Sequence, residues 1–252
     1  MKAAQQRPND EMLGCCNFRD LGGHRVPGGL TRRGRLYRSD SLASASPAQQ
    51  ANFNAWRFAT VIDLRTPHEV ARGGRYTSGA DYYNLPLGDP VAEVTATGWS
   101  SAEHVAARYF DFLVESEASV RKSLAVLSDG AAYPAVIHCS LGKDRTGILV
   151  ALVLSLVGVD DDGVAADYAL SGMGTARLAL HLRELCHGDM SELTAFLPAL
   201  LSADPDTIRC FLAMVRASFG SVEGYTDHIG AANCRVALRH ALVEPIGAVG
   251  VS

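Results

Sequence analysis

One short segment, His138 to Gly147, holds residues whose types and spacing suit chemistry on a phosphate group. It reads HCSLGKDRTG, with Cys139 near its start and Arg145 six positions later. A segment that leaves a strand and enters a helix can turn several backbone N–H groups into one concavity that favours an anion. Arg145 adds a planar cation able to hold two phosphate oxygens. Cys139 is therefore expected to be a thiolate at neutral pH and the nucleophile of phosphoryl transfer through a phosphocysteine.

The middle of this segment is expected to form the phosphate cradle. Ser140 and Leu141 contribute backbone N–H groups, whatever their side chains do. Gly142 lets the backbone bend where a side chain would crowd the cradle. Lys143 either places a second cation beside the phosphate or lies in solvent.

Two further residues of the segment each have two candidate roles. Thr146 either hydrogen-bonds the sulfur of Cys139 and assists its departure or acts in capping the helix. Asp144 either serves as an acid or base in catalysis or holds the loop and Lys143 in place. A second pair with the same spacing, Cys210 and Arg216, has no glycine between its members and lies in an apolar helical pattern, so it is assigned to the core.

The segment is predicted to lie between a strand and a helix. The run 135–138 predicts a short buried strand, and 146–157 predicts an apolar helix. Further strands are predicted at 36–38, 60–64 and 82–87, and further helices at 46–56, 102–115 and 118–127. After residue 158 the pattern is that of almost continuous helix. Together these elements predict an α/β fold with a mostly parallel sheet flanked by helices and a helical C-terminal third.

Composition excludes several other classes of protein. The net charge of −4 over 252 residues argues against a nucleic-acid binder, and no apolar run is long enough to span a membrane. No secretory signal is visible at the N-terminus. The six cysteines form no CxxC pair, so a zinc cluster or a disulfide framework is not expected. The expected location is the cytoplasm, with reduced thiols.

Other motifs accompany the segment in a fixed order. They are NFRDLGG at 17–23, LYRSD at 36–40, VIDLRTPHEV at 61–70, LPLGD at 85–89 and AADY at 165–168. With HCSLGKDRTG, they resemble the bacterial cysteine-dependent tyrosine phosphatases, a family that acts on phosphotyrosine and phosphoinositides. The resemblance extends from about residue 15 to about residue 230. It implies an α/β phosphatase domain with a helical lid and with no cofactor or metal.

The resemblance also implies roles outside the cradle. Asp89 is its candidate for the acid that protonates the leaving oxygen, although an Asp-Pro pair is also a common start of a turn. His138 would order the loop rather than titrate during turnover. Lys143 is associated in related lipid phosphatases with highly anionic inositol phosphates, and so indicates that class or a sugar diphosphate. Four residues of these motifs are expected to form a buried network that braces the loop, with direct contact to the substrate as the less favoured alternative: Arg19, Asp20, Arg38 and Asp63.

We expect a single phosphatase domain over 15–245, with 1–14 as an extension, 171–205 as a candidate helical lid and 246–252 as a tail. Its substrate would be a phosphate ester, either a phosphoprotein, a phosphoinositide or a small metabolite such as a nucleoside or sugar phosphate. The alternative from a different class is a phospho-ligand binding module without activity. Intact Cys139, Gly142 and Arg145 argue against that alternative. The sequence assigns no oligomeric state.

Overall fold

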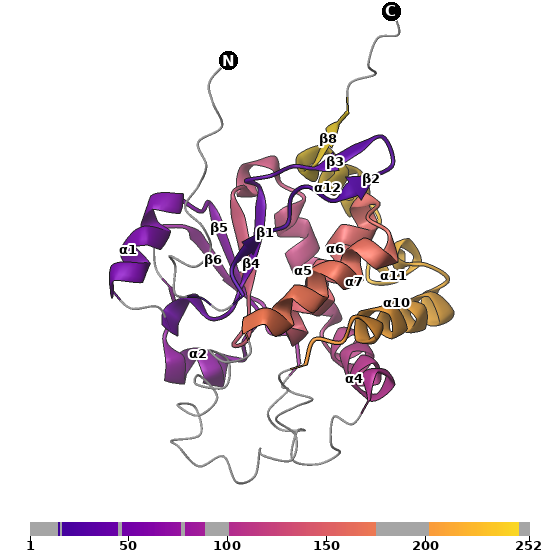
Figure 1. Ribbon diagram of the computed structural model, residues 1–252, viewed down its shortest axis with the longest axis horizontal. Helices are drawn as coiled ribbons and strands as arrows, with labels where there is room; N and C mark the ends of the chain where they lie inside the picture. The colour runs from indigo at the N-terminus through magenta and orange to yellow at the C-terminus, as the bar shows by residue number, and fades with distance from the viewer. Residues whose placement is uncertain are drawn as a thin grey trace, which may run out of the picture.

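The computed structural model describes residues 15, 17–44, 47–76, 79–88, 101–174 and 202–246. At its centre lies a five-stranded sheet (Figure 1). All strands but the first run parallel, and the first pairs antiparallel with its neighbour at one edge. The strands lie in the order β1 (Arg19–Asp20), β4 (Leu36–Ser39), β7 (Ala135–His138), β5 (Thr60–Asp63) and β6 (Asp81–Asn84).

Helices pack against both faces of this sheet (Figure 1). One face is covered by α1 (Pro47–Trp56) through an aromatic cluster that includes Phe53 and Tyr37. Helix α2 (Pro67–Gly73) follows β5. The larger core on the opposite face is built from α4 (Ala102–Glu115), α5 (Glu117–Leu127), α6 (Asp144–Val157), α7 (Asp161–Ala169), α10 (Pro205–Phe219), α11 (Val222–His228) and α12 (Cys234–Leu242).

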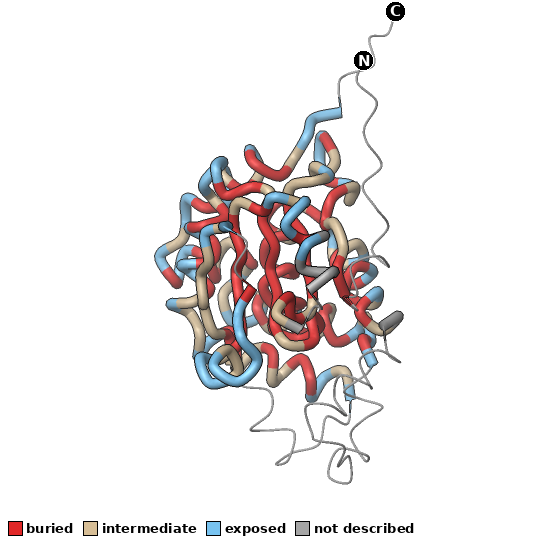
Figure 2. Tube along the Cα trace, turned by 90° about the vertical axis from the view of Figure 1, so that its left-hand side faces the viewer, coloured by how far each residue is buried: buried red, intermediate tan, exposed pale blue. Residues whose placement is uncertain are grey.

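The alternation of side chains along each strand explains these two cores. In β7, Val136 packs into the aromatic cluster, whereas Ala135 and Ile137 pack into the larger core. All four residues of β7 are buried, as are those of β4 and β5 on either side. Figure 2 shows this buried centre in red, with the exposed segments at the periphery. A central strand buried on both faces is typical of a parallel sheet.

A second, smaller sheet corrects the prediction of continuous helix near the C-terminus. It is formed by β2 (Arg25–Val26), β3 (Gly29–Thr31) and β8 (Val243–Pro245), all antiparallel. Helix α12 ends at Leu242, and Pro245 disfavours the helical conformation in Glu244, the residue before it. The backbone of β8 then approaches β3 closely, and a side-chain carbon at Gly29 would lie only 2.2 Å from the carbonyl oxygen of Glu244.

The predicted mostly parallel sheet flanked by helices is confirmed. The helix that follows the loop after β7 begins at Asp144, two residues earlier than predicted, so Asp144 and Arg145 lie in its first turn. The candidate lid at 171–205 falls largely outside the described residues, because 175–201 are not among them. Residues 1–14 and 247–252, assigned to the extension and the tail, also lie outside.

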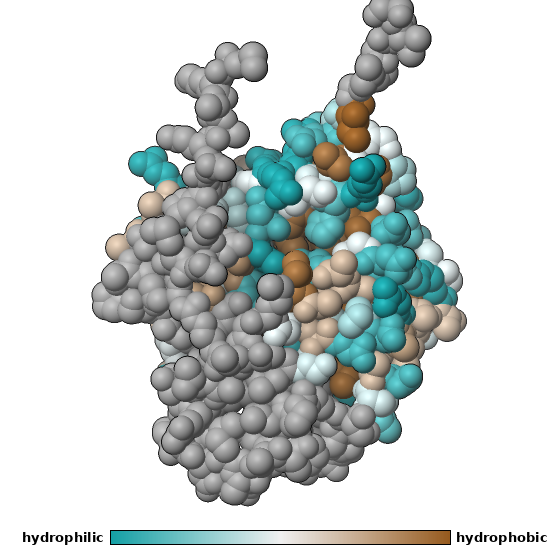
Figure 3. All heavy atoms as spheres, in the orientation of Figure 1, coloured by the Kyte–Doolittle hydropathy of each residue, from teal (hydrophilic) through white to brown (hydrophobic). Residues whose placement is uncertain are grey.

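The described part of the chain contains no helix long and apolar enough to cross a membrane. Its large exposed hydrophobic side chains are dispersed over different elements. On the face seen in Figure 3, hydrophilic side chains cover much of the described surface and the hydrophobic ones form small patches. The exposed hydrophobic residues are Val114, Leu170, Val236 and Ile246.

Candidate active site

Residues 139–145, called the phosphate loop from here on, connect β7 to the first turn of α6 at the carboxyl end of the parallel strands. This end of an α/β sheet is where ligands usually bind. Cys139 is 1% exposed and Arg145 is 2% exposed. Cys139 follows the last residue of the central strand, and Lys143 is the N-terminal flanking residue of α6. The loop therefore brings a thiol and the positive end of a helix dipole together.

The sulfur of Cys139 accepts a hydrogen bond from the backbone N–H of Gly142 at 3.2 Å. This contact folds the loop back over the thiol and directs a backbone donor at it. Thr146 lies in the first turn of α6, fully buried, and its hydroxyl has no hydrogen-bond partner among the described residues. Neither of the two predicted bonds of Thr146, to the sulfur or as a helix cap, is present there.

Gly142 is required by the backbone of the phosphate loop. It has a φ of 67°, a conformation that residues with a side chain rarely adopt. A side-chain carbon at this position would lie 2.5 Å from the backbone nitrogen of Asp40 and from the carbonyl carbon of Ser39. The loop therefore packs directly on the end of β4, which fixes its position relative to the neighbouring strand.

Arg145 is held by a bidentate ion pair with Glu69 of α2. The Nη1 and Nη2 groups of Arg145 donate to the two carboxylate oxygens of Glu69 at 2.6 and 2.8 Å. The Nε group of Arg145 is buried and has no hydrogen-bond partner among the described residues. Burial opposes the charge of Arg145, but Glu69 outweighs it and raises the pKa of Arg145 above its usual range. The result is a cation fixed in place by Glu69.

Glu69 is a site residue that the sequence predictions missed. Its carboxylate also accepts from the hydroxyl of Ser140 at 2.6 Å and from the backbone N–H of Thr66 at 2.7 Å. Burial would raise the pKa of Glu69, but the hydrogen bonds and charge of Arg145 lower it to about 2. The signal was present as a capping box, TPHE, in which Thr66 caps α2 and Glu69 is its third residue. That motif, placed directly after β5, positions a carboxylate at the carboxyl end of the sheet.

Arg38 braces the phosphate loop from β4, as predicted for the supporting network. It is fully buried, and its Nη2 group donates to the carbonyl oxygens of Gly142 and Lys143 at 2.7 and 3.4 Å. Its other terminal nitrogen pairs with Asp167 of α7, which also binds Arg19 at 2.9 Å. Burial opposes ionisation of Asp167, but Arg38 and Arg19 lower its pKa to about 2.

Asp63 anchors a second buried cluster beside the nucleophile. Its carboxylate accepts from Arg65 and from the hydroxyl of Tyr82, both at 2.7 Å. His138 lies next to it, with its Nε2 atom 3.6 Å from the carboxylate of Asp63. The Nδ1 atom of His138 is 3.3 Å from the carbonyl oxygen of Cys139. Burial lowers the pKa of His138, so a neutral ring that orders the loop fits its environment better than a titrating one.

Two predicted residues do not join this cluster. Asp20 accepts from the backbone N–H groups of Gly22 and Gly34 at 2.8 and 2.7 Å, so it braces the chain around the turn between them and not the phosphate loop. Asp89 lies outside the described residues, and its role stays a prediction. The chain just before it is fixed beside the end of β5, because the N–H of Leu87 donates to the carbonyl oxygen of Leu64 at 3.2 Å. The N–H of Gly88 donates to the hydroxyl of Ser116, between α4 and α5, at 3.1 Å.

The remaining residues of the phosphate loop are tied to their surroundings. The carbonyl oxygen of Leu141 accepts from the side chain of Asn17 at 2.6 Å. The ammonium group of Lys143 lies 3.2 Å from Asp144 and donates to the carbonyl oxygen of Ser202 at 2.9 Å. Asp144 also accepts from the hydroxyl of Tyr109 at 2.5 Å. Both Lys143 and Asp144 are therefore buried and engaged, and neither is a freely solvated side chain.

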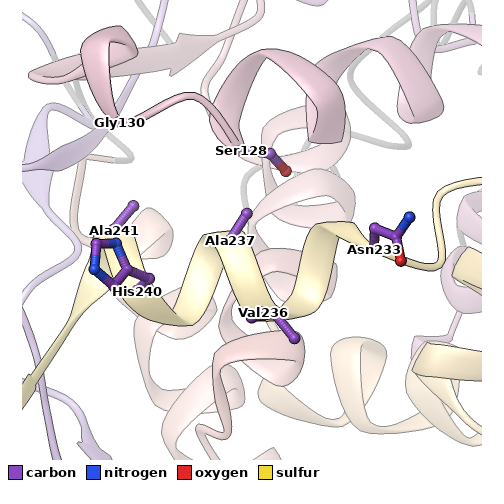
Figure 4. Close-up of a pocket in the computed structure, with 7 residues that line it drawn as sticks. All are labelled: Ser128, Gly130, Asn233, Val236, Ala237, His240 and Ala241. Atoms are coloured by element: carbon purple, nitrogen blue, oxygen red, sulfur yellow. The ribbon is translucent and has the colours of Figure 1, made fainter.

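A separate cavity of about 570 Å³ lies away from this site. Figure 4 shows it beside α12, close to the end of α5, and none of the residues that line it belongs to the phosphate loop. Gly130 in its wall precedes β7, so the cavity is near the amino end of the central strand. The phosphate loop is at the other end. The cavity is lined by Ser128, Gly130, Asn233, Val236, Ala237, His240 and Ala241.

A thiol in a loop before a helix, with a fixed arginine six residues later, on a mostly parallel sheet, defines the class of cysteine-dependent phosphatases. The model of the tyrosine phosphatase family matches residues 11–244. The chain therefore belongs to the tyrosine phosphatase family and is a phosphatase.

Two relatives and one solved structure are similar to this chain. The triple specificity protein phosphatase PtpB of Mycobacterium tuberculosis is 30% identical over 266 residues, which covers 90% of this chain and 95% of that protein. A putative tyrosine-protein phosphatase of Cupriavidus necator is 28% identical, over 83% of this chain and 79% of its own length. The crystal structure of TpbA of P. aeruginosa matches 83% of this chain and 96% of its own at 20% identity, with a TM-score of only 0.33.

Substitution of Gly142 by alanine is expected to abolish turnover. The new methyl group would collide with the backbone at the end of β4 and would demand a strained φ, so the loop must move away from the thiol. The measurement is hydrolysis of p-nitrophenyl phosphate together with the thermal midpoint. Gly130→Ala is the control, because nothing lies within 4 Å of the added carbon. A Gly142→Ala variant with wild-type turnover would contradict the close packing.

Substitution of Glu69 by glutamine is expected to remove part of the acid sensitivity of the fold. The pKa of Glu69 is lowered from 4.5 to about 2, so its carboxylate stabilises the folded state above pH 4.5 and this contribution is lost as the pH falls towards 2. The free energy of unfolding of Glu69→Gln should be lower than that of the wild type by about 2–3 kcal/mol at pH 6. The difference in free energy of unfolding between the wild type and Glu69→Gln should be smaller by roughly half at pH 3. Urea denaturation at both pH values measures it, and a constant difference would show that the charge of Glu69 is not responsible.

Proposed function

We propose that this phosphatase hydrolyses phosphotyrosine in proteins, with phosphoinositides as a second substrate class, through a phosphocysteine at Cys139. The observation that carries the proposal is the arrangement of the phosphate loop. The sulfur of Cys139 accepts from the backbone N–H of Gly142, two residues before α6 begins. Arg145, in the first turn of α6, has two nitrogens fixed by Glu69 and a third without a partner among the described residues. The names of the relatives, a triple specificity protein phosphatase and a putative tyrosine-protein phosphatase, support these substrates.

In the proposed reaction the thiolate of Cys139 attacks phosphorus, the S–P bond forms and the bond to the leaving oxygen breaks. The negative charge on the transferring group is stabilised by Arg145 and by the N–H groups at the start of α6. A water molecule then attacks the phosphocysteine, gives a proton to a carboxylate base and releases inorganic phosphate. The S–P bond breaks and the thiolate of Cys139 is restored, so the cycle needs no cofactor.

Asp89 is the proposed acid that protonates the leaving oxygen and then the base that takes the proton from water. The described segment before Asp89 ends at Gly88, and the N–H of Leu87 donates to the carbonyl oxygen of Leu64 just after β5 at 3.2 Å. Asp89 therefore follows a segment that is held at the carboxyl end of the sheet. Asp144 suits this role less well, because its carboxylate is 4% exposed and is already bound by Tyr109 and Lys143. Its proposed role is therefore to hold the loop.

Lys143 is the proposed determinant of phosphoinositide hydrolysis. Lys143 is 1% exposed and lies in the same loop as Cys139 and Arg145, so its ammonium group, paired with Asp144, adds a positive charge close to the cradle. A substrate with several phosphate groups gains more from this charge than one with a single phosphate group. The proposed location is the cytoplasm, where reducing conditions protect Cys139 from disulfide formation.

The assignment of the acid predicts how Asp89→Asn responds to the leaving group. Without an acid, phenyl phosphate, whose leaving oxygen needs a proton, should lose about 100-fold in kcat. An activated ester with a dinitrophenol leaving group should lose less than tenfold. Asp81→Asn, an exposed carboxylate at the start of β6, is the control. Equal losses in kcat for both esters would show that Asp89 is not the general acid.

The substrate class is tested by phosphate release, measured in EDTA, from a phosphotyrosine peptide, a phosphoserine peptide, phosphoinositides, and nucleoside and sugar phosphates. The phosphotyrosine peptide and the phosphoinositides are expected to be hydrolysed fastest. Cys139→Ser, as the blank, should be silent on every substrate and should still bind vanadate. A preference for a nucleoside or sugar phosphate would make the protein a metabolite phosphatase. Binding of phosphate without turnover of any substrate would show that the protein is a phospho-ligand binding module.

A further inference from the structure

Two tyrosines and a carboxylate form a buried chain behind the phosphate loop. The hydroxyl of Tyr109 in α4 donates to the Oδ1 atom of Asp144 at 2.5 Å. On its other side it lies 2.7 Å from the hydroxyl of Tyr168 in α7. The same oxygen of Asp144 is 3.2 Å from the ammonium group of Lys143. One carboxylate oxygen of the loop is thus shared by a phenol and an ammonium group.

The direction of these hydrogen bonds follows from the chemistry of the groups. Tyr109 is 0% exposed, and burial together with the charge of Asp144 raises its pKa well above the usual range, so the phenol keeps its proton. An ionised carboxylate only accepts hydrogen bonds, and a phenol has one proton to donate. Tyr109 therefore donates to Asp144, and Tyr168 donates to the oxygen of Tyr109.

The position of Tyr109 is rigid, as a positioning role requires. Its ring packs edge-on against Tyr168 and Phe211, each with ring centroids 6.3 Å away. Tyr168 in turn packs on Gly147 in the first turn of α6, where a side-chain carbon would lie 3.0 Å from the ring. The phenols therefore have little room to move relative to the phosphate loop.

Asp144 poses an electrostatic problem for a loop that binds anions. It lies between Lys143 and Arg145, and a negative charge at this position repels a bound phosphate group. A carboxylate fixed by a phenol and an ammonium group has its charge directed away and partly neutralised, whereas one that can rotate can approach the anion.

We propose that Tyr109 is a positioning residue of the phosphate loop, whose hydroxyl holds the Asp144 carboxylate against Lys143 so that this negative charge does not weaken the binding of the phosphate group. The proposal rests on the proposed function, since it concerns the loop that binds the substrate's phosphate. No contact between Tyr109 and the substrate is required.

The test is the affinity of the full chain for orthovanadate, measured by isothermal titration calorimetry in EDTA, which needs no turnover. Tyr109→Phe keeps the ring and removes only the hydroxyl, and it should raise the dissociation constant about tenfold. Tyr168→Phe is the matched control. It removes a hydroxyl that touches Tyr109 and not Asp144, and it should change the dissociation constant less than threefold.

A double-mutant cycle separates this effect from simple packing. Because asparagine carries no charge, Tyr109→Phe should weaken vanadate binding less than threefold when it is added to Asp144→Asn. An equal loss in both backgrounds would show that Tyr109 acts through packing, and the proposal would be wrong. Unchanged affinity of Tyr109→Phe, or a wild-type protein that does not bind vanadate, would overturn it as well.

The test also covers a Tyr109→Phe variant that does not fold and a wild-type protein that has no phosphatase activity. If Tyr109→Phe does not fold, as judged from its thermal midpoint, Asp144→Glu replaces it. Its extra methylene group moves the carboxylate off the hydroxyl of Tyr109, so it should weaken binding about tenfold, and unchanged affinity would overturn the proposal. If vanadate binding behaves as expected but no phosphate ester is hydrolysed, the proposed function fails and the role of Tyr109 stands.

Discussion

The geometry of the site depends on one buried guanidinium group. Arg38 binds the carbonyl oxygens of Gly142 and Lys143 from the β4 side of the loop. A peptide unit that turns its carbonyl towards Arg38 must turn its N–H group the opposite way, because the unit is planar. The carbonyl oxygens, which would repel an anion, are thereby drawn to a cation, and the N–H groups are left to line the cradle. Asp167 holds Arg38 in turn, so α7 helps to set the shape of a loop that it does not enter.

Charge is buried around this loop in pairs of opposite sign. Removing a partner from a buried pair leaves an unpaired charge and costs several kcal/mol. Four buried cations near the loop each pair with a different carboxylate, and Asp167 also pairs with Arg19. Within the described ranges, the fold thus supplies positive charge for a phosphate group from cations that are already paired. The pairs are Arg38 with Asp167, Arg65 with Asp63, Lys143 with Asp144, and Arg145 with Glu69.

The sequence made the local part of this arrangement predictable. The β-branched strand, the glycine and the apolar helix around Cys139 are adjacent in the chain, so their pattern is visible without knowledge of the fold. The partners come from far away: Tyr109 lies 35 residues before Asp144, and Glu69 lies 76 residues before Arg145. Asp20 was grouped with the loop because its motif resembles the family, yet its carboxylate caps a turn. Only tertiary packing decides which distant polar side chain meets the loop.

The order of the strands has a consequence for how the protein is made. β7 lies between β4 and β5 in the sheet but follows both in the chain. During synthesis, β4 and β5 have no common neighbour until residue 138 has left the ribosome, and a long-range pairing of this kind is slow to form. The nucleophile is the next residue to emerge. The segment that completes the sheet is therefore the same one that delivers the reactive thiol, and no shorter nascent chain carries an active centre.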